Sequence, residues 1–229
     1  DLSMNDLNGI LFNIASSVPG FLLAIVVHEA AHAWMANRFG DATAKNQGRL
    51  SLNPAVHYDM FGTIIFPLVA AFANFAVIGW ARPVPIEPRN FKNLRSGIFW
   101  VSFAGPLSNL IVGTLSALFL ALVATKVPSD WGYYDITLRM LRFSVFINFI
   151  LAFFNLIPLP PLDGSKMVSA FLKGEALYKY EQIARYTPVI FILVMALSLM
   201  GIHTIGYLLL PAQYLANALV FGFVALFGG

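Results

Sequence analysis

Long uncharged runs alternate with short polar segments along the whole chain. Five runs contain no Asp, Glu, Lys or Arg, and they cover residues 10–27, 62–81, 96–125, 143–162 and 186–229. About 20 consecutive apolar residues are enough for a helix to cross the hydrocarbon core of a bilayer. The last run is long enough for two helices and predicts a hairpin that turns near residues 201–203. The pattern therefore predicts an all-α polytopic membrane protein.

The positions of Lys and Arg predict how these segments are arranged across the membrane. Segments 38–60, 82–95 and 166–185 contain 11 of the 14 basic residues, which favours the cytoplasmic side for all three. A full span at 62–81 would place the first two segments on opposite sides, whereas a re-entrant element would keep them together. We therefore expect five spanning segments plus one re-entrant element, with six spans as the alternative, and the prolines in 82–95 predict short extended backbone there.

Composition supports the membrane class and excludes several others. Charged residues make up 11% of the chain and apolar residues 59%, and the mean hydropathy is +0.75, whereas a soluble domain carries about 25% charged residues. The chain has no cysteine, which excludes a thiolate metal site, a disulfide framework and a cysteine nucleophile. The net charge of +3 is small and dispersed, so no nucleic-acid partner is expected. We expect one membrane domain over 1–229, with a core at 9–164 and a C-terminal hairpin at 186–229.

The first apolar run leads directly into the sequence His28-Glu29-Ala30-Ala31-His32. Residues four apart share one face of a helix, so the two imidazoles can bind one metal ion. Glu29, beside them, can act as a general base. Ionisable groups at membrane depth are costly and indicate a functional site. The alternative is a helix end at which polar side chains meet lipid headgroups.

A catalytic zinc site takes three protein ligands and leaves one position open for water. Asp163 is the strongest candidate for the third ligand, because three prolines before it end an apolar helix and should leave it on irregular backbone at the membrane edge. His57 and Asp59, in the polar segment after the first helix, compete for this role. A plain turn before Gly164 is the structural alternative for Asp163.

In these motifs the chain resembles the site-2 protease family of intramembrane zinc metalloproteases, and in particular its compact prokaryotic branch without PDZ or CBS domains. The resemblance covers residues 21–175. It rests on His28 to His32, on Ala104-Gly105-Pro106 with Asn109, and on Asn155 to Pro158 leading to Leu162-Asp163-Gly164. Segments 48–59 and 79–85 also look like this branch.

The resemblance implies one Zn²⁺ per chain, bound by His28, His32 and Asp163, with Glu29 as the general base. It implies that Asn155 holds the substrate backbone or the developing oxyanion. Two further residues are candidates for substrate binding or gating: Asn109, for which a hydrogen bond across helices is the alternative, and His57.

The implied reaction is hydrolysis of peptide bonds within or near transmembrane segments of membrane-protein substrates. A substrate helix must unwind locally, and we expect it to lie as an extended strand beside segment 41–60 or 82–95. The expected location is a prokaryotic inner membrane, with the active site towards the cytoplasm. The oligomeric state is unknown from the sequence.

Two competing functions use the same residues. A membrane protein that binds or transports zinc without hydrolysis would need the ligands, but it would not need a base such as Glu29 beside them. A membrane-anchored zinc protease that cuts soluble or unfolded chains usually takes a Glu from a later helix as its third ligand. Here the corresponding stretch reads Leu162-Asp163-Gly164, which favours the intramembrane enzyme.

Overall fold

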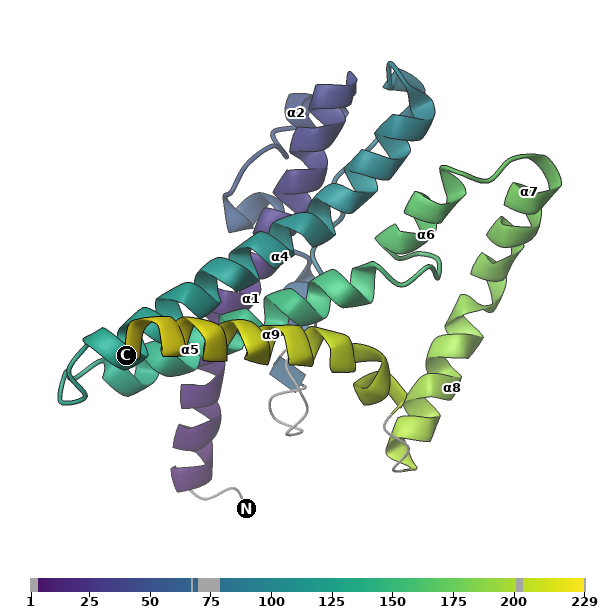
Figure 1. Cartoon of the computed structure of the whole chain (residues 1–229). Helices are drawn as coiled ribbons and strands as arrows, with labels where there is room; N and C mark the ends of the chain where they lie inside the picture. Colours follow the sequence, from purple (N-terminus) through teal and green to yellow (C-terminus); the bar gives the residue numbers. More distant parts are fainter. Residues whose placement is uncertain (1–3, 67, 70–78, 201–203, 229) are drawn as a thin grey trace.

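The structure is a computed structural model that describes residues 4–66, 68–69, 79–200 and 204–228 (Figure 1). Its elements are α1 (Met4–Phe39), α2 (Thr43–Asn46), η1 (Pro54–Val56), η2 (Met60–Ile65), η3 (Pro88–Asn90), α4 (Leu94–Lys126), α5 (Tyr134–Asn155), α6 (Asp163–Ser169), α7 (Gly174–Gln182), η4 (Ile183–Tyr186), α8 (Thr187–Leu199) and α9 (Thr204–Gly228). No strand occurs in the described part of the chain, so the predicted all-α class is confirmed.

Four helices in the described ranges are long and apolar enough to cross a membrane. They are Phe12–Phe39 in α1, Leu94–Lys126, Tyr134–Asn155 and Gly206–Gly228 in α9. The sequence predicted five or six such segments. The difference arises in the C-terminal run, where α8 has 13 residues and is shorter than the length that a span requires. The turn of the predicted hairpin, at residues 201–203, lies outside the described residues.

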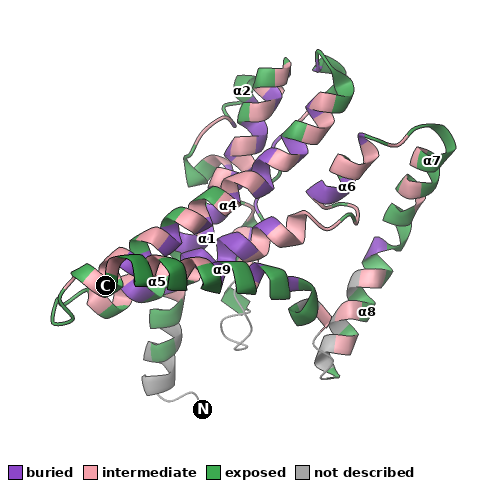
Figure 2. Ribbon diagram, viewed as in Figure 1, coloured by how far each residue is buried: buried purple, intermediate pink, exposed green. Residues whose placement is uncertain are grey.

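The core of the molecule is the contact of α1, α4 and α5, and α9 lies across the last two of these helices (Figure 1). Phe149 of α5 is almost fully buried and packs with Ala117 and Leu120 of α4 and with Ala216 of α9. Figure 2 shows buried positions gathered where these helices meet and exposed positions along their outer faces. Large apolar side chains such as Phe119 point outwards, as a surface in contact with lipid tails requires.

The two basic segments on either side of the predicted re-entrant element lie together. The Lys92 N–H donates to the Phe39 carbonyl at 2.9 Å, and the Trp80 N–H donates to the Gly62 carbonyl at 3.1 Å. The chain thus leaves and returns at one place, which does not fit a full membrane crossing between 62 and 81. Residues 67 and 70–78 lie outside the described residues, so the re-entrant element itself stays a prediction.

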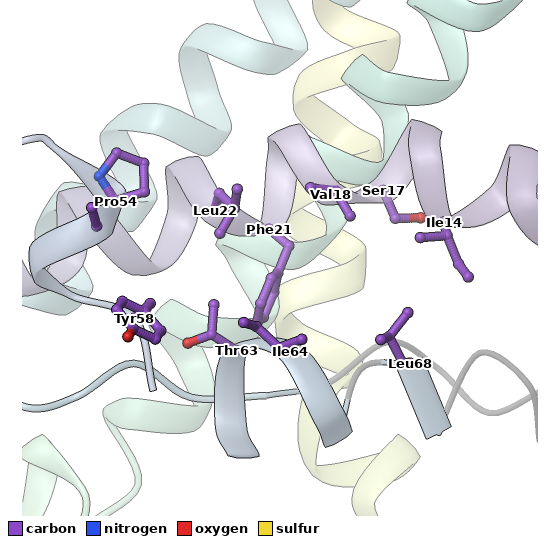
Figure 3. A pocket seen from close by; sticks show the side chains of 11 residues that line it. Ile14, Ser17, Val18, Phe21, Leu22, Pro54, Tyr58, Thr63, Ile64 and Leu68 are labelled. Carbon is purple, nitrogen blue, oxygen red and sulfur yellow. The ribbon is translucent and has the colours of Figure 1, made fainter. Parts of the chain in front are cut away.

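An apolar pocket of about 360 Å³ lies between α1 and residues 54–68 (Figure 3). Phe21 and Leu22 of α1 contribute to one wall, and Tyr58 and Ile64 contribute to the other. No charged side chain lines this pocket, and it shares no lining residue with the cavity at the histidines. It therefore offers no carboxylate or imidazole for metal binding.

Candidate metal centre

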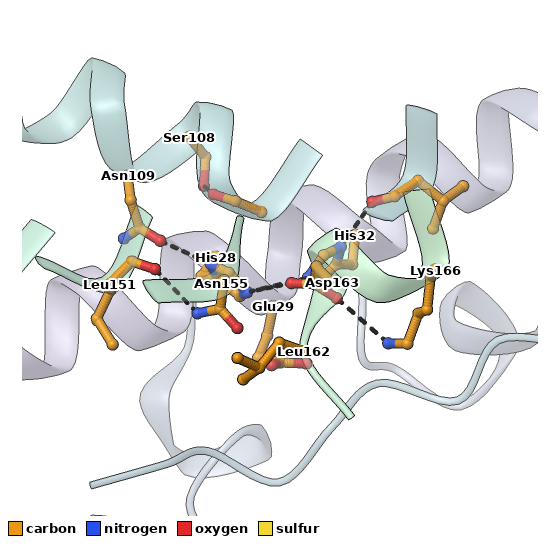
Figure 4. Close-up of polar contacts among 12 residues, drawn as sticks. His28, Glu29, His32, Ser108, Asn109, Leu151, Asn155, Leu162, Asp163 and Lys166 are labelled. Atoms are coloured by element: carbon orange, nitrogen blue, oxygen red, sulfur yellow. Dashed lines mark hydrogen bonds and ion pairs between the residues drawn. The ribbon is translucent and has the colours of Figure 1, made fainter. Parts of the chain in front are cut away.

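Two helices and one helix start converge on the predicted metal site. His28 and His32 lie one turn apart on α1 and are buried against α4, while Asp163 is the first residue of α6. The two Nε2 atoms are 3.0 Å apart. Asp163 Oδ2 lies 3.2 Å from Nε2 of His28 and 3.1 Å from Nε2 of His32 (Figure 4). The structure therefore brings the three predicted ligands to one point.

The geometry and the donor types of this cluster fit zinc. Zinc bonds of about 2.0–2.1 Å in a tetrahedral arrangement place the ligand atoms roughly 3.3 Å apart, close to the separations seen here. Two imidazole nitrogens and one carboxylate oxygen form a ligand set of the kind that catalytic zinc uses, with a fourth position for water. No other trio of His, Asp or Glu in the described ranges converges in this way.

Each imidazole is oriented by a hydrogen bond on its far side. The His28 Nδ1–H donates to Asn109 Oδ1 at 2.6 Å, and the His32 Nδ1–H donates to the Val101 carbonyl at 2.7 Å. Both acceptors belong to α4. These bonds leave both Nε2 lone pairs directed at the cluster, and partners of this kind are typical of metal-binding histidines.

Asn109 lies behind His28 and not in the cavity. It is fully buried, and its Nδ2 donates to the Ala24 carbonyl at 3.0 Å and to Asn148 Oδ1 at 2.9 Å. Both amide donors and the Oδ1 acceptor are therefore in use within the protein. This placement agrees with the alternative of hydrogen bonding across helices and does not support substrate binding by Asn109.

The small residue Gly105 makes room for the site on α4. A Cβ atom at this position would lie 2.4 Å from His32 Nε2 and 2.6 Å from His28 Nε2, which is too close for any real contact. The helix backbone can approach the two imidazoles only because this side chain is absent. In the sequence, Gly105 was part of the family resemblance only, and its packing role comes from the structure.

Asp163 begins a helix, which corrects the prediction of irregular backbone. The prolines after Asn155 end α5, as expected, but α6 starts directly at Asp163. Lys166, one turn later, places its Nζ 3.2 Å from Asp163 Oδ1, so that Oδ2 is left to face the histidines. Sequence analysis missed Lys166, although the spacing of three residues on a helix could have indicated this pair.

A cavity of about 350 Å³ opens beside the cluster. Its walls come from α1, from extended backbone at 79–86, from the end of α5 and from the start of α6. Glu29 lines this cavity, and its Oε2 accepts a hydrogen bond from the Val84 N–H at 2.8 Å. The predicted base is thus placed at the cavity by main-chain contact with a segment 55 residues away.

Asn155 also lines the cavity, at the last residue of α5. Its Nδ2 donates to the Leu151 carbonyl one turn earlier, at 3.0 Å (Figure 4). The second hydrogen of this NH₂ group forms no hydrogen bond to the described residues, so it is free to donate to a substrate. Its predicted role stays a prediction.

His57 and Asp59 do not join the metal cluster. His57 is fully buried, and its Nε2 donates to the Ser51 carbonyl at 2.7 Å. Asp59 accepts from the Gly62 N–H and caps η2. Of the three candidates for the third ligand position, Asp163 is the one that the structure groups with the two histidines.

Comparisons with known proteins agree with this site. Residues 133–195, which include Asn155 and Asp163, match the model of peptidase family M50. A Bacillus subtilis protein, provisionally named zinc metalloprotease YwhC, is 39% identical over 188 residues, or 80% of this chain and 82% of the relative. The Mycolicibacterium smegmatis protein Rip2, also provisionally named a zinc metalloprotease, is 29% identical over 160 residues, or 69% of this chain and 58% of the relative. No solved structure matches the chain.

The similarity to YwhC extends over most of both chains, and four of the described helices are long and apolar enough to cross a membrane. The predicted enzyme class and its zinc requirement are thereby confirmed. The convergence of His28, His32 and Asp163, together with this similarity, shows that the chain is an integral membrane protein that belongs to peptidase family M50, the site-2 protease family of zinc metalloproteases.

Proposed function

We propose that this metalloprotease hydrolyses peptide bonds within or near the transmembrane segments of membrane-protein substrates. The observation that carries the proposal is the position of the metal site within the apolar part of the molecule. His28 and His32 belong to the spanning segment Phe12–Phe39, and the cavity beside them is lined by apolar side chains such as Leu151 and Ile25. A substrate that reaches this cavity is most readily one that is already in the membrane.

The residues of the cavity supply the groups that peptide hydrolysis requires. Zinc held by His28, His32 and Asp163 would polarise the scissile carbonyl and activate a water molecule. Glu29 would take the proton from that water and return it to the leaving amine. Asn155, through the second hydrogen of its amide nitrogen, would donate to the carbonyl oxygen as negative charge develops there.

Segment 79–86 offers an edge to which an unwound substrate can bind. The N–H groups of Trp80, Arg82 and Val84 all donate to the protein. Backbone groups alternate in direction along an extended chain, so the groups of Ala81 face away from those of Trp80 and Arg82. Ala81 lines the cavity, and its main chain makes no hydrogen bond to the described residues. An extended substrate could pair with these groups by β-strand addition.

The protein is proposed to lie in the inner membrane of a prokaryotic cell, with its active site open towards the cytoplasm. The support is the positive-inside rule, because segments 38–60, 82–95 and 166–185 together contain 11 of the 14 basic residues. The segments 38–60 and 82–95 contact each other, as this topology requires.

The test is proteolysis by the full chain reconstituted in liposomes. The substrates are a panel of single-span membrane proteins and one denatured soluble protein, and Glu29→Gln is the control. We expect cleavage of a membrane substrate by the parent and none by Glu29→Gln, with one zinc per chain in both proteins. Cleavage of only the soluble chain would indicate a membrane-anchored protease, and bound zinc without any cleavage would indicate a zinc-binding or transport protein.

A further inference from the structure

We infer that Arg49 is a positioning residue for catalysis, because it holds the extended backbone at 82–84 whose Val84 amide in turn holds the Glu29 carboxylate. The inference rests on the proposed role of Glu29 as the base. Arg49 was part of the family resemblance in the sequence, but neither the sequence nor the comparisons assign it a role.

The contacts form a short chain from Arg49 to the cavity. Arg49 is 7% exposed, and its Nη2 donates to the Arg82 carbonyl at 2.6 Å and to the Pro83 carbonyl at 3.4 Å. The next residue is Val84, whose N–H donates to Glu29 Oε2 at 2.8 Å. Arg49 therefore binds the carbonyls of Arg82 and Pro83, and Glu29 binds the amide of the next residue, Val84.

Burial of a guanidinium is costly unless ion pairs or hydrogen bonds compensate its charge, and no carboxylate in the described part of the chain forms an ion pair with Arg49. Its described hydrogen bonds go to main-chain carbonyls instead. Pro83 and Pro85 have no N–H, and the segment belongs to no sheet, so regular secondary structure cannot hold its carbonyls. A planar guanidinium with several donors suits two adjacent carbonyls.

Other contacts keep the segment docked when Arg49 is removed. The Val84 side chain is buried with Ala33 and Ala44, and the Glu87 N–H donates to Asp41 Oδ2 at 2.7 Å. The loss of Arg49 should therefore loosen the main chain at 82–84 without detaching the segment. Its effect should appear in the placement of Glu29.

The placement of a glutamate base matters because the side chain has several rotatable bonds. A general base has to lie within hydrogen-bond reach of the proton that it takes. The Val84 N–H occupies Oε2 of Glu29 and leaves Oε1 for water. A displacement of about 1 Å at a reacting group can lower the rate by about 100-fold.

The first measurement compares Arg49→Ala and Arg49→Lys with the parent in liposomes. For Arg49→Ala we expect a kcat lowered by about tenfold or more, a KM within about threefold and one zinc per chain. The amides of Trp80 and Arg82 still bond to Gly62 and His57 and hold the substrate edge at Ala81, so the main change is in the orientation of the base. Arg49→Lys, which keeps a donor to the carbonyls, should recover part of kcat. Arg89→Ala removes an exposed arginine of the same region and serves as the matched control. An unchanged kcat, or a raised KM with normal kcat, would overturn the inference.

A second pair of variants tests the route through Val84, and it does so even if Arg49→Ala fails to fold. Val84→Pro removes the N–H that donates a hydrogen bond to Glu29, whereas Val84→Ala keeps it. Only the proline variant should therefore have a lower kcat. Adding Arg49→Lys to Val84→Pro should cause little further loss, because residues that act through one contact are not additive. Losses that multiply would contradict the proposed route.

Hydrogen exchange separates this inference from the proposed function, since it needs no substrate. Pro83 and Pro85 have no amide hydrogen, so Val84 contributes a resolvable share of deuterium uptake by a peptide covering 82–87. In Arg49→Ala this uptake should rise, and in Arg89→Ala it should not. If the parent cleaves no substrate, the proposed function fails, but hydrogen exchange still tests whether Arg49 holds the backbone at Val84. Unchanged uptake in Arg49→Ala would refute that role of Arg49.

Discussion

At the scale of single residues, the metal centre depends on groups that do not touch the metal position themselves. Val101 and Asn109 orient the two imidazoles, Lys166 orients the carboxylate, and Gly105 leaves the space in which all of them meet. Buried polar groups are stable only when they are hydrogen-bonded, and each of these bonds also selects one side-chain orientation. Small changes around the site should therefore alter metal binding.

Gly105→Ala should lower the zinc content of the purified protein well below one per chain. The added methyl group would lie within 2.6 Å of both imidazoles, so at least one has to move out of the ligand position. Loss of partners around metal ligands typically lowers metal affinity by about 10- to 100-fold. The measurement is elemental analysis after dialysis against a weak chelator. Gly222→Ala is the matched control, because a Cβ there has nothing within 4 Å; full zinc retention in Gly105→Ala would show that the site adapts.

Asn155→Ala should retain zinc and the fold but cleave a helical membrane substrate about 100-fold more slowly or worse, the scale for loss of an oxyanion donor. Its amide lines the cavity, and a neutral amide is a poor zinc ligand beside His28, His32 and Asp163. The measurements are single-turnover cleavage and zinc content. Cleavage at the parent rate would refute the role, and loss of zinc would mean that Asn155 supports the ligands instead.

At the scale of elements, the extended backbone at 79–87 is held in place by contacts with the helices and loops around it. It is held near its start by Gly62, in its middle by Arg49 and Glu29, and at its end by Asp41. Each anchor bonds main-chain groups, which suits a segment whose prolines prevent regular pairing. The segment can therefore serve as a cavity wall although it belongs to no sheet.

Asp41 ties the end of this segment to the end of α1. It is fully buried and accepts hydrogen bonds from Thr43, Asn90 and the Glu87 N–H. Burial by itself raises the pKa of the Asp41 carboxyl, but the hydrogen bonds from Thr43, Asn90 and Glu87 outweigh it and hold the pKa below its usual value. A folded-state pKa below the unfolded value stabilises the fold above the unfolded value, near pH 4, and this contribution is lost as the pH falls through the folded pKa.

Asp41→Asn should accordingly lower the free energy of unfolding by about 1–3 kcal/mol at pH 7, because an amide NH₂ would face a donor. The difference between parent and variant should shrink as the pH falls below about 4, the unfolded pKa, and through the lower folded pKa, at which the carboxyl of the folded parent becomes protonated. Thermal unfolding in detergent at both pH values provides the measurement, with the exposed Glu175→Gln as control. A difference that does not depend on pH would mean that the charge of Asp41 contributes nothing.

At the scale of the whole molecule, the bundle of α1, α4 and α5 keeps its polar groups inside and apolar groups outside. Asn109 bonds to Asn148 and Ser116 bonds to Ser144 between α4 and α5, while Phe119 and Ile111 are exposed on the outer face. This distribution suits a bilayer, where an unsatisfied polar group would be costly. The end of α1 lies beside the basic segment 82–95, where the Lys92 N–H donates to the Phe39 carbonyl.

Residues 45–55 and 85–95 should both be cytoplasmic. Single cysteines at Lys45 and Lys92 can be labelled from either side in sealed vesicles, and no native cysteine interferes. Both should react from the same face, because the main chain of Lys92 bonds to that of Phe39 just before the first segment. Labelling from opposite faces would instead establish a full span at 62–81.

Local spacing determined a large part of this site and fold from the sequence alone. His28, Glu29 and His32 could be assigned because the helix repeat alone puts two imidazoles on one face, and α1, α4 and α5 could be located because a bilayer demands long apolar runs. In the last uncharged run, α8 and α9 lie on either side of the predicted turn, but α8 has 13 residues and is too short to span, which the prediction did not allow for. Composition does not specify where a helix stops.

Only the tertiary structure decided which distant groups meet these residues. Asp163 lies 131 residues from His32, and from sequence it competed with His57 and Asp59. Neither Asn109 behind His28 nor Arg49 behind Val84 follows from any local repeat, because both depend on how α4 and the extended segment pack on α1. Side-chain spacing within one element is set by backbone geometry, whereas contacts between elements are set by packing of the whole chain.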